Sequence, residues 1–183
     1  MANPSLDVSI VVSTQGDLYD HCYVKKLMRL EAAERFVETY YRSLNGHRQD
    51  LASYYAPAST MPNGQPTPII LWNGNVIPDP ATFQKIFEEQ MPQSHYNMQG
   101  FDCQVLNPNY SSGFADASKS ESGKNVSLLV TVSGRVVYGD YREGDTRGFS
   151  ESFVLIPNPD TARDGKKHIR QWLIQSQNFR LVV

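Results

Sequence analysis

The chain has 183 residues, of which 40% are hydrophobic, 20% charged and 11% aromatic, and its formal net charge is −2. This composition excludes a disordered tail, a coiled coil and a collagen-like chain, and the near-neutral charge argues against a protein that grips nucleic acid over its whole surface. No apolar run approaches the roughly 20 residues that cross a bilayer, and the first residues lack the pattern of a signal peptide, so we expect an intracellular protein.

The first third of the sequence predicts helices. Residues 1–16 are mostly polar and are expected to form a flexible arm, with an edge strand around Val8 to Val12 as the alternative. Apolar residues then recur at helical spacing from about Asp17 to Leu44, and Asn45-Gly46 provides a stop. Asp50 to Tyr55 predicts a second, short helix.

A loop, a strand and a helix are expected in the middle of the chain. Residues 57–68 are rich in proline and predict a loop. Ile69 to Gly74 predicts a short buried strand that runs into a turn. Asp79 and Pro80 are expected to cap and begin a helix whose apolar stripe spans Phe83 to Met91.

The rest of the chain predicts strands. They are expected at Tyr96 to Leu106, Val126 to Tyr138, Phe149 to Ile156 and His168 to Val183, with a long loop insertion at about 107–125. Helices that precede a run of antiparallel strands indicate the α+β class. We expect a single domain over residues 17–183.

The alternation in these strands places apolar residues on both faces of the sheet. Between residues 126 and 138, Val130 and Val132 share one face, and Leu129 and Val137 lie on the other. The two later strands are similar, but the expected helices can cover only one face. The second apolar face therefore predicts a partner packed against it, and a strongly curved sheet that closes on itself is the alternative.

Catalytic motifs are missing from the sequence. It has no glycine-rich phosphate-binding loop, no nucleophile elbow and no metalloprotease motif. The four histidines lie far apart, so we expect no metal site, no cofactor and no catalytic residue. Asp102 or His95 could serve as a base if the protein were an enzyme, although Asp102 is interpreted as a solvated strand residue.

Some charged residues are candidates for contacts with partners. Two basic clusters are interpreted as solvated, with a contact to RNA or a ribosomal particle as the alternative: Lys25, Lys26 and Arg29, and Lys166, Lys167 and Arg170. Arg180 differs, because it lies between Phe179 and Leu181 in the most apolar strand. An unpaired buried charge is costly, so an acid on another subunit would stabilise Arg180 and specify which subunit binds.

Several segments, taken in order, resemble the nuclear transport factor 2-like family. They cover roughly residues 28–183 and comprise Phe36 to Tyr41, Leu51 to Tyr55, Trp72 to Gly74, Phe83 to Pro92, Val130 to Gly134, Phe149 to Leu155 and Asn178 to Leu181. The resemblance implies a cone, in which helices pack into the concave face of a bent antiparallel sheet and the convex face serves for dimerisation.

Within that family, the chain most resembles the fungal small subunit of the messenger RNA export heterodimer. The extra N-terminal helix and the 107–125 insertion support this likeness, and Ser176-Gln177 stands where the import factor for the small GTPase Ran has Asn-Asp. The resemblance implies a non-catalytic subunit that binds a large subunit. The pair would carry messenger RNA and pre-60S particles through nuclear pores by binding Phe-Gly nucleoporins, and would shuttle between nucleus and cytoplasm.

The resemblance also implies an interface. It places Arg180 opposite a buried acid of the large subunit. The remaining residues expected at the interface are Ile174, Ser176, Asn178, Val130, Val132 and Phe153, and a β-bulge would change the side on which the first three lie. Two alternatives are a homodimeric import factor for a small GTPase and a small-molecule isomerase or dehydratase of the same fold.

Overall fold

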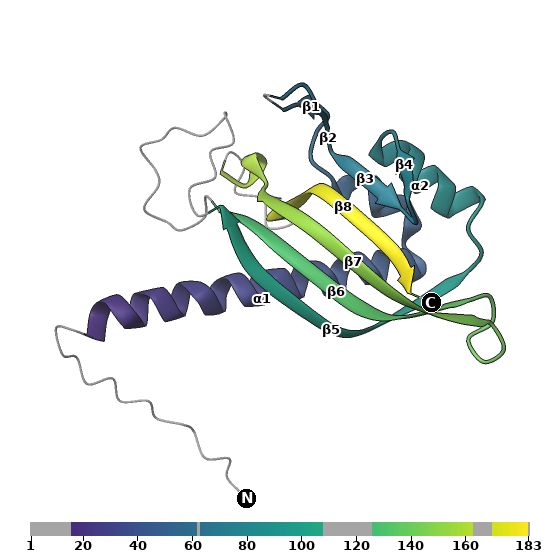
Figure 1. Ribbon diagram of the computed structural model, residues 1–183, viewed down its shortest axis with the longest axis horizontal. Coiled ribbons are helices and arrows are strands. Elements are labelled where there is room, and N and C mark those ends of the chain that lie inside the picture. Colours follow the sequence, from purple (N-terminus) through teal and green to yellow (C-terminus); the bar gives the residue numbers. More distant parts are fainter. Residues whose placement is uncertain (1–15, 62, 108–125, 163–169, 183) are drawn as a thin grey trace, which may run out of the picture.

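Figure 1 shows a computed structural model, which describes residues 16–61, 63–107, 126–162 and 170–182. Several predictions fall outside this description: the strand at Val8 to Val12, most of the 107–125 insertion, Lys166 and Lys167. The side chains of residues 16–29, which include Lys25, Lys26 and Arg29, are also outside it.

The elements follow the order expected from the sequence. The helices are α1 (Gly16–Gly46), the 3-10 helix η1 (Arg48–Tyr54), α2 (Pro80–Glu89) and the 3-10 helix η3 (Pro159–Ala162). The strands are β1 (Ser59–Thr60), β2 (Pro66–Thr67), β3 (Ile69–Trp72), β4 (Asn75–Ile77), β5 (Ser94–Asn107), β6 (Ser127–Tyr138), β7 (Asp145–Pro157) and β8 (Trp172–Val182). The predicted loop at 57–68 contains the small β1–β2 hairpin, and the short second helix is a 3-10 helix.

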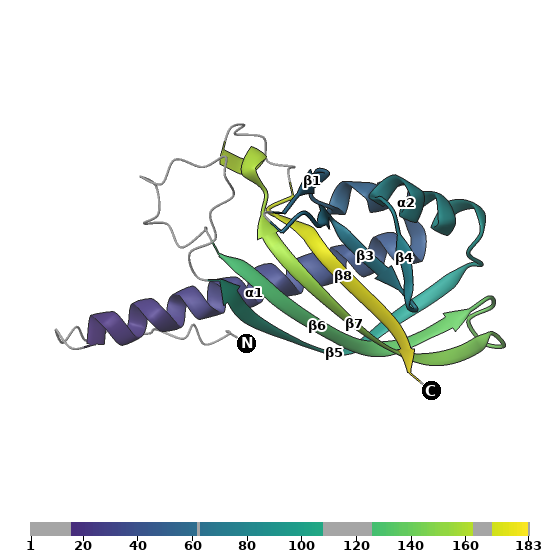
Figure 2. The same ribbon diagram turned by 45° about the horizontal axis from the view of Figure 1, so that its top comes forward.

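One bent sheet of six strands forms the frame of the described structure. Its order is β4-β3-β8-β7-β6-β5, and every pair is antiparallel except β3 with β8. Helices α1 and α2 lie on the concave side of this sheet (Figures 1 and 2). The predicted α+β class and cone are therefore confirmed.

Helix α1 reaches the sheet through its C-terminal half. Its buried side chains recur at helical spacing, from Ala33 through Phe36, Tyr40 and Leu44. At the helix end, the Asn45 side chain pairs with the backbone of Tyr96, donating to its carbonyl at 3.1 Å and accepting from its N–H at 2.7 Å. This pair fixes the helix against the edge strand β5.

Helix α2 begins as the sequence predicts. The Asp79 carboxylate accepts from the Thr82 N–H at 2.8 Å, and Pro80 occupies the first turn. The Thr82 hydroxyl donates to the same carboxylate at 2.8 Å, and the two hydrogen bonds hold the pKa of Asp79 below its usual value. Phe83 and Phe87 point from the helix into the core, where both meet Trp72 of β3 at ring-centroid distances of 5.3 and 5.0 Å.

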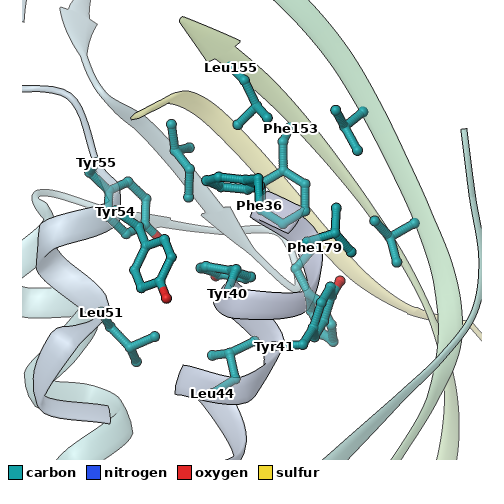
Figure 3. Packing of buried hydrophobic residues seen from close by; sticks show 14 of the residues in the cluster. Phe36, Tyr40, Tyr41, Leu44, Leu51, Tyr54, Tyr55, Phe153, Leu155 and Phe179 are labelled. Carbon is teal, nitrogen blue, oxygen red and sulfur yellow. The ribbon is translucent and has the colours of Figure 1, made fainter. Parts of the chain in front are cut away.

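Aromatic side chains fill the cone (Figure 3). Phe36 and Tyr40 of α1 meet Phe153 of β7 edge to face at 5.8 and 5.1 Å, and Trp72 stacks on Phe179 at 3.8 Å. Burying such a side chain contributes roughly 1.5–3 kcal/mol each, before any aromatic pairing. The core is therefore the main source of stability, and its side chains fill the interior of the cone.

A β-bulge shifts the register between β7 and β8. Val154 pairs with Ser176 and Leu155 with Ile174, so one extra residue of β8 lies between them. As a result, Ile174 and Phe179 both face the core with no exposed area. Simple alternation would place these two residues on opposite faces of the sheet, and the bulge brings them to the same face because it changes parity within the strand.

Candidate docking surface

The convex side of the sheet, which we call the open face, is covered by no described helix (Figures 1 and 2). Its residues alternate with the buried ones along each long strand. The open face comprises Gly100, Asp102 and Gln104 of β5, Leu129, Thr131, Ser133 and Arg135 of β6, Gly148, Ser150, Ser152 and Val154 of β7, and Ser176, Asn178, Arg180 and Val182 of β8.

Cross-strand rows give this face a polar centre. One row joins Thr131, Ser152 and Asn178, and the next joins Ser133, Ser150 and Arg180. Apolar side chains lie toward one end, in the row of Leu129 and Val154. The expected second apolar face is thus present only as a half-buried band, and polar residues and glycines occupy most of the other positions.

Arg180 lies on the open face and is exposed. Its side chain crosses the turn between β3 and β4, where a Cβ added to Gly74 would lie 3.6 Å from Nη1. Beside it, the Asn73 Oδ1 accepts from the Leu181 N–H at 2.8 Å and ties this turn to β8. Within the described part of the chain, Arg180 has no ion pair, so its guanidinium is available to a partner carboxylate.

The structure divides the other expected interface residues into two groups. Ser176 and Asn178 lie beside Arg180 on the open face, so their assignment to the interface stays a prediction. The other four are core residues with at most 2% exposure: Ile174, Val130, Val132 and Phe153. A side chain already buried within its own chain cannot line a partner surface, so the expectation for these four was wrong. The bulge turns Ile174 inward, and the other three face the helices.

Of the predicted basic clusters, only Arg170 has a described side chain. It is half-buried, and its guanidinium carbon lies 3.8 Å from the centroid of the Tyr54 ring. This stacking favours a cation–π contact that holds the strand start against the core. The proposed contact of this cluster with RNA or a ribosomal particle stays a prediction.

A buried polar network lies on the concave side, beneath the aromatic core. Glu151 accepts from the Tyr41 hydroxyl and from the Gln177 amide, both at 2.5 Å. The same amide donates to the Tyr40 hydroxyl at 2.7 Å, and the Tyr55 hydroxyl donates to the Gln177 carbonyl oxygen. Burial raises the pKa of Glu151 to about 7, although the two hydrogen bonds oppose this shift. Every polar atom of the Glu151 and Gln177 side chains therefore has a partner within the chain.

The residues that an enzyme would need do not meet in a cavity. Asp102 is exposed on the open face, where its carboxylate accepts from the Gln104 amide at 2.9 Å. His95 lies half-buried near the β6–β7 turn, with its ring 5.4 Å from that of Tyr141. Phe36, Tyr40, Phe83 and Phe87 fill the cone interior. Among the described residues, no three metal-binding side chains lie close enough to hold an ion, and no helix could cross a membrane.

Sequence reasoning missed two charged residues. Glu151 takes the same side of β7 as Phe149 and Phe153, so its alternation with apolar residues could have indicated a buried carboxyl. Arg135 takes the side opposite Val136 in β6 and could have been placed beside Ser133 on the open face. Both residues were missed because an alternating pattern defines two faces of a strand but does not indicate which face packs against the helices.

The filled cone, the bent sheet and the open face define a nuclear transport factor 2-like protein. The structure titled "Structure of Mtr2" superposes with a TM-score of 0.68 and 26% identity, covering 84% of this chain and 99% of that one. A chain in "Chaetomium thermophilum Mex67 NTF2-like domain complexed with Mtr2" superposes with a TM-score of 0.68 and 28% identity. The match covers 84% of this chain and 98% of that one. These likenesses confirm the predicted fold and the predicted resemblance to the fungal small export subunit.

Curated relatives agree with the structures. NTF2-related export protein 2 of Mus musculus is 32% identical over 158 residues, which cover 86% of this chain and 89% of the relative. NTF2-related export protein 1 of Bos taurus is 26% identical over 149 residues, which cover 81% of this chain and 85% of the relative. No protein-family model matches the chain. The chain belongs to the family of the NTF2-related export proteins.

Proposed function

We propose that this chain is the small, non-catalytic subunit of a heterodimeric nuclear export receptor for messenger RNA. Its partner is a larger protein similar to Mex67, which docks on the open face. The observation that carries the proposal is an exposed, unpaired Arg180 on a sheet face without a described helix, in a chain whose relatives are named export proteins. A structure titled as Mex67 complexed with Mtr2 supports the same pairing.

The role proposed for the small subunit is to bind the large subunit through a complementary surface, and not to catalyse a reaction. Burial of the apolar band gives affinity, and a partner carboxylate opposite Arg180 gives specificity, because a charge without its counter-charge is penalised when the interface excludes water. The aromatic core leaves the carboxyl of Glu151 enclosed, which favours a structural role over catalysis. For the heterodimer we further propose three roles. It passes through nuclear pores by binding Phe-Gly nucleoporins, it exports pre-60S particles, and it shuttles between nucleus and cytoplasm.

Affinity purification of the tagged chain from its own cells at moderate salt, followed by mass spectrometry, tests the proposal. We expect one stoichiometric larger protein with a second domain of this fold. A stable homodimer with no such partner would instead favour the import-factor alternative.

The charge-reversing variant Arg180→Asp tests the docking surface. Placing an acid against the expected partner acid should weaken the heterodimer by roughly 3 kcal/mol or more, which is at least about a hundredfold in affinity. Arg142→Asp, in the exposed turn between β6 and β7, changes the net charge equally and should bind like the unaltered chain. Unchanged capture of the large subunit by Arg180→Asp would overturn the assignment of Arg180.

A further inference from the structure

A second arginine lies on the open face without a described partner. Arg135 of β6 is exposed, and its neighbours in the strand, Gly134 and Val136, are buried on the other side. Its guanidinium takes part in no hydrogen bond or ion pair among the described residues. The sheet therefore presents two free guanidinium groups, those of Arg135 and Arg180, on the same surface.

The register places these two arginines in adjacent rows. Ser133, Ser150 and Arg180 form one row, and Arg135, Gly148 and Val182 form the next. One strand, β7, separates β6 from β8, and the rows are two residues apart. Standard strand spacing then sets the two arginine backbones roughly 12 Å apart.

Small residues occupy the surface between the arginines. Ser150 and Gly148 lie on β7 between them, and Ser133 precedes Arg135 on the same side of β6. A Cβ added at Gly148 would meet only the backbone oxygen and Cβ of Val182, at 3.5 and 3.6 Å. A partner surface can therefore approach the backbone here, between two long cationic side chains.

The charge on this part of the open face is uncompensated. Asp102 is the one acidic residue among the open-face positions. It lies on β5 opposite Thr131, three strands from β8 and two rows from Arg135. Its carboxylate already accepts a hydrogen bond from Gln104. By contrast, Arg147 in the neighbouring hairpin is paired within the chain, with Nε 2.8 Å from the Asp145 carboxylate. The two open-face guanidinium groups thus lack the internal counter-charge that Arg147 has.

We propose that Arg135 is a second specificity-determining contact for the docked subunit. The partner presents two carboxylates to this end of the sheet, one for Arg180 and another for Arg135. A surface with a single acid can satisfy one arginine and leaves the other desolvated without a counter-charge, which selects against it. The inference rests on the proposed function, since it assigns a second contact on the same docking surface.

Surface plasmon resonance with the purified Mex67-like protein of the same organism tests this inference. Arg135→Glu is compared with Arg135→Gln, with Arg180→Glu and with Arg142→Glu, which has the same charge change in the exposed β6–β7 turn. We expect Arg135→Glu to raise Kd at least tenfold and Arg135→Gln to raise it less. Arg142→Glu should stay within twofold. The loss for Arg135→Glu should shrink as salt rises from 50 to 500 mM, because added ions screen the repulsion.

The outcomes separate the second contact from the proposed function. If Arg180→Glu weakens binding while Arg135→Glu binds like the unaltered chain, the second contact is refuted and the docking face stands. If Arg135→Glu and Arg142→Glu lose affinity equally, the loss comes from the change in the net charge of the protein and not from a direct contact, and the second contact is again refuted. If the unaltered chain does not bind the Mex67-like protein, the proposed function itself fails. Circular dichroism of each variant confirms that the fold is retained.

Discussion

A single arginine joins the start of η1, the end of α2 and the start of β5. The Arg48 guanidinium donates to the carbonyl oxygens of Phe87, Met91 and Pro92 at 2.6, 2.9 and 2.7 Å, and to the Ser94 hydroxyl at 2.9 Å. It thereby satisfies the carbonyl groups at the end of α2 and fixes the chain as it enters β5. The planar fork of arginine suits this set of acceptors, whereas a lysine ammonium offers only one point of charge.

Replacing Arg48 should therefore destabilise the fold without touching the docking surface. We expect Arg48→Ala to lower the free energy of unfolding by about 3 kcal/mol, because several acceptors, most of them partly buried, lose charged donors at once. Arg48→Lys should recover less than half of this loss. Urea unfolding followed by circular dichroism measures both, with Arg142→Ala as the exposed control that stays within about 0.5 kcal/mol. Equal stability of Arg48→Ala and the unaltered chain would contradict this account.

The Glu151 network connects α1 to the two central strands, β7 and β8. Tyr41 comes from the helix, Glu151 from β7 and Gln177 from β8. Since burial raises the pKa of Glu151 from 4.5 to about 7, the folded chain keeps a proton that the unfolded chain releases between these two values. The free energy of unfolding should therefore fall as pH rises from about 4.5 to 7, by at most roughly 3 kcal/mol from this group, and level off above that range.

The substitution Glu151→Gln should remove this slope. The glutamine side chain at position 151 cannot ionise. Between pH 5 and 7 the free energy of unfolding of the variant should therefore depend less on pH than that of the unaltered chain, whatever its absolute value. Glu143→Gln, which alters an exposed carboxylate in the β6–β7 turn, should keep the slope. Chemical denaturation at a series of pH values gives the comparison, and parallel curves for the unaltered chain and Glu151→Gln would show that Glu151 is not the titrating group.

The sequence predicted where helices and strands lie along the chain better than which face of the sheet each side chain occupies. The long helix ending at Asn45-Gly46, the Asp79 cap and the four long strands depend on local signals, and all are confirmed by the structure. The side on which Val130 lies depends instead on which face of the sheet the helices cover, and alternation within a strand carries no information on that. The bulge before Ser176 depends on pairing with β7, so Ile174 could not be placed from its own strand alone.

If the partner docks on the open face as proposed, the stability of the whole molecule should depend on the partner. A partner that binds only the folded chain stabilises it by about 2.7 kcal/mol when present at a hundred times Kd. For a protein of this size, that gain raises Tm by roughly 5–10 °C. We therefore expect the Tm of the chain to rise with the concentration of the Mex67-like protein, measured by a fluorescence signal specific to the small chain.

Arg180→Asp separates this linkage from the intrinsic stability of the fold. The guanidinium is exposed and lacks an ion pair among the described residues, so the isolated variant should melt within about 2 °C of the unaltered chain. With the partner at a concentration that saturates the unaltered chain, the variant should gain little, because its weaker binding leaves the folded state mostly free. Equal gains for both chains would mean that the partner docks away from Arg180, and a variant that melts early on its own would mean that Arg180 serves the fold rather than the interface.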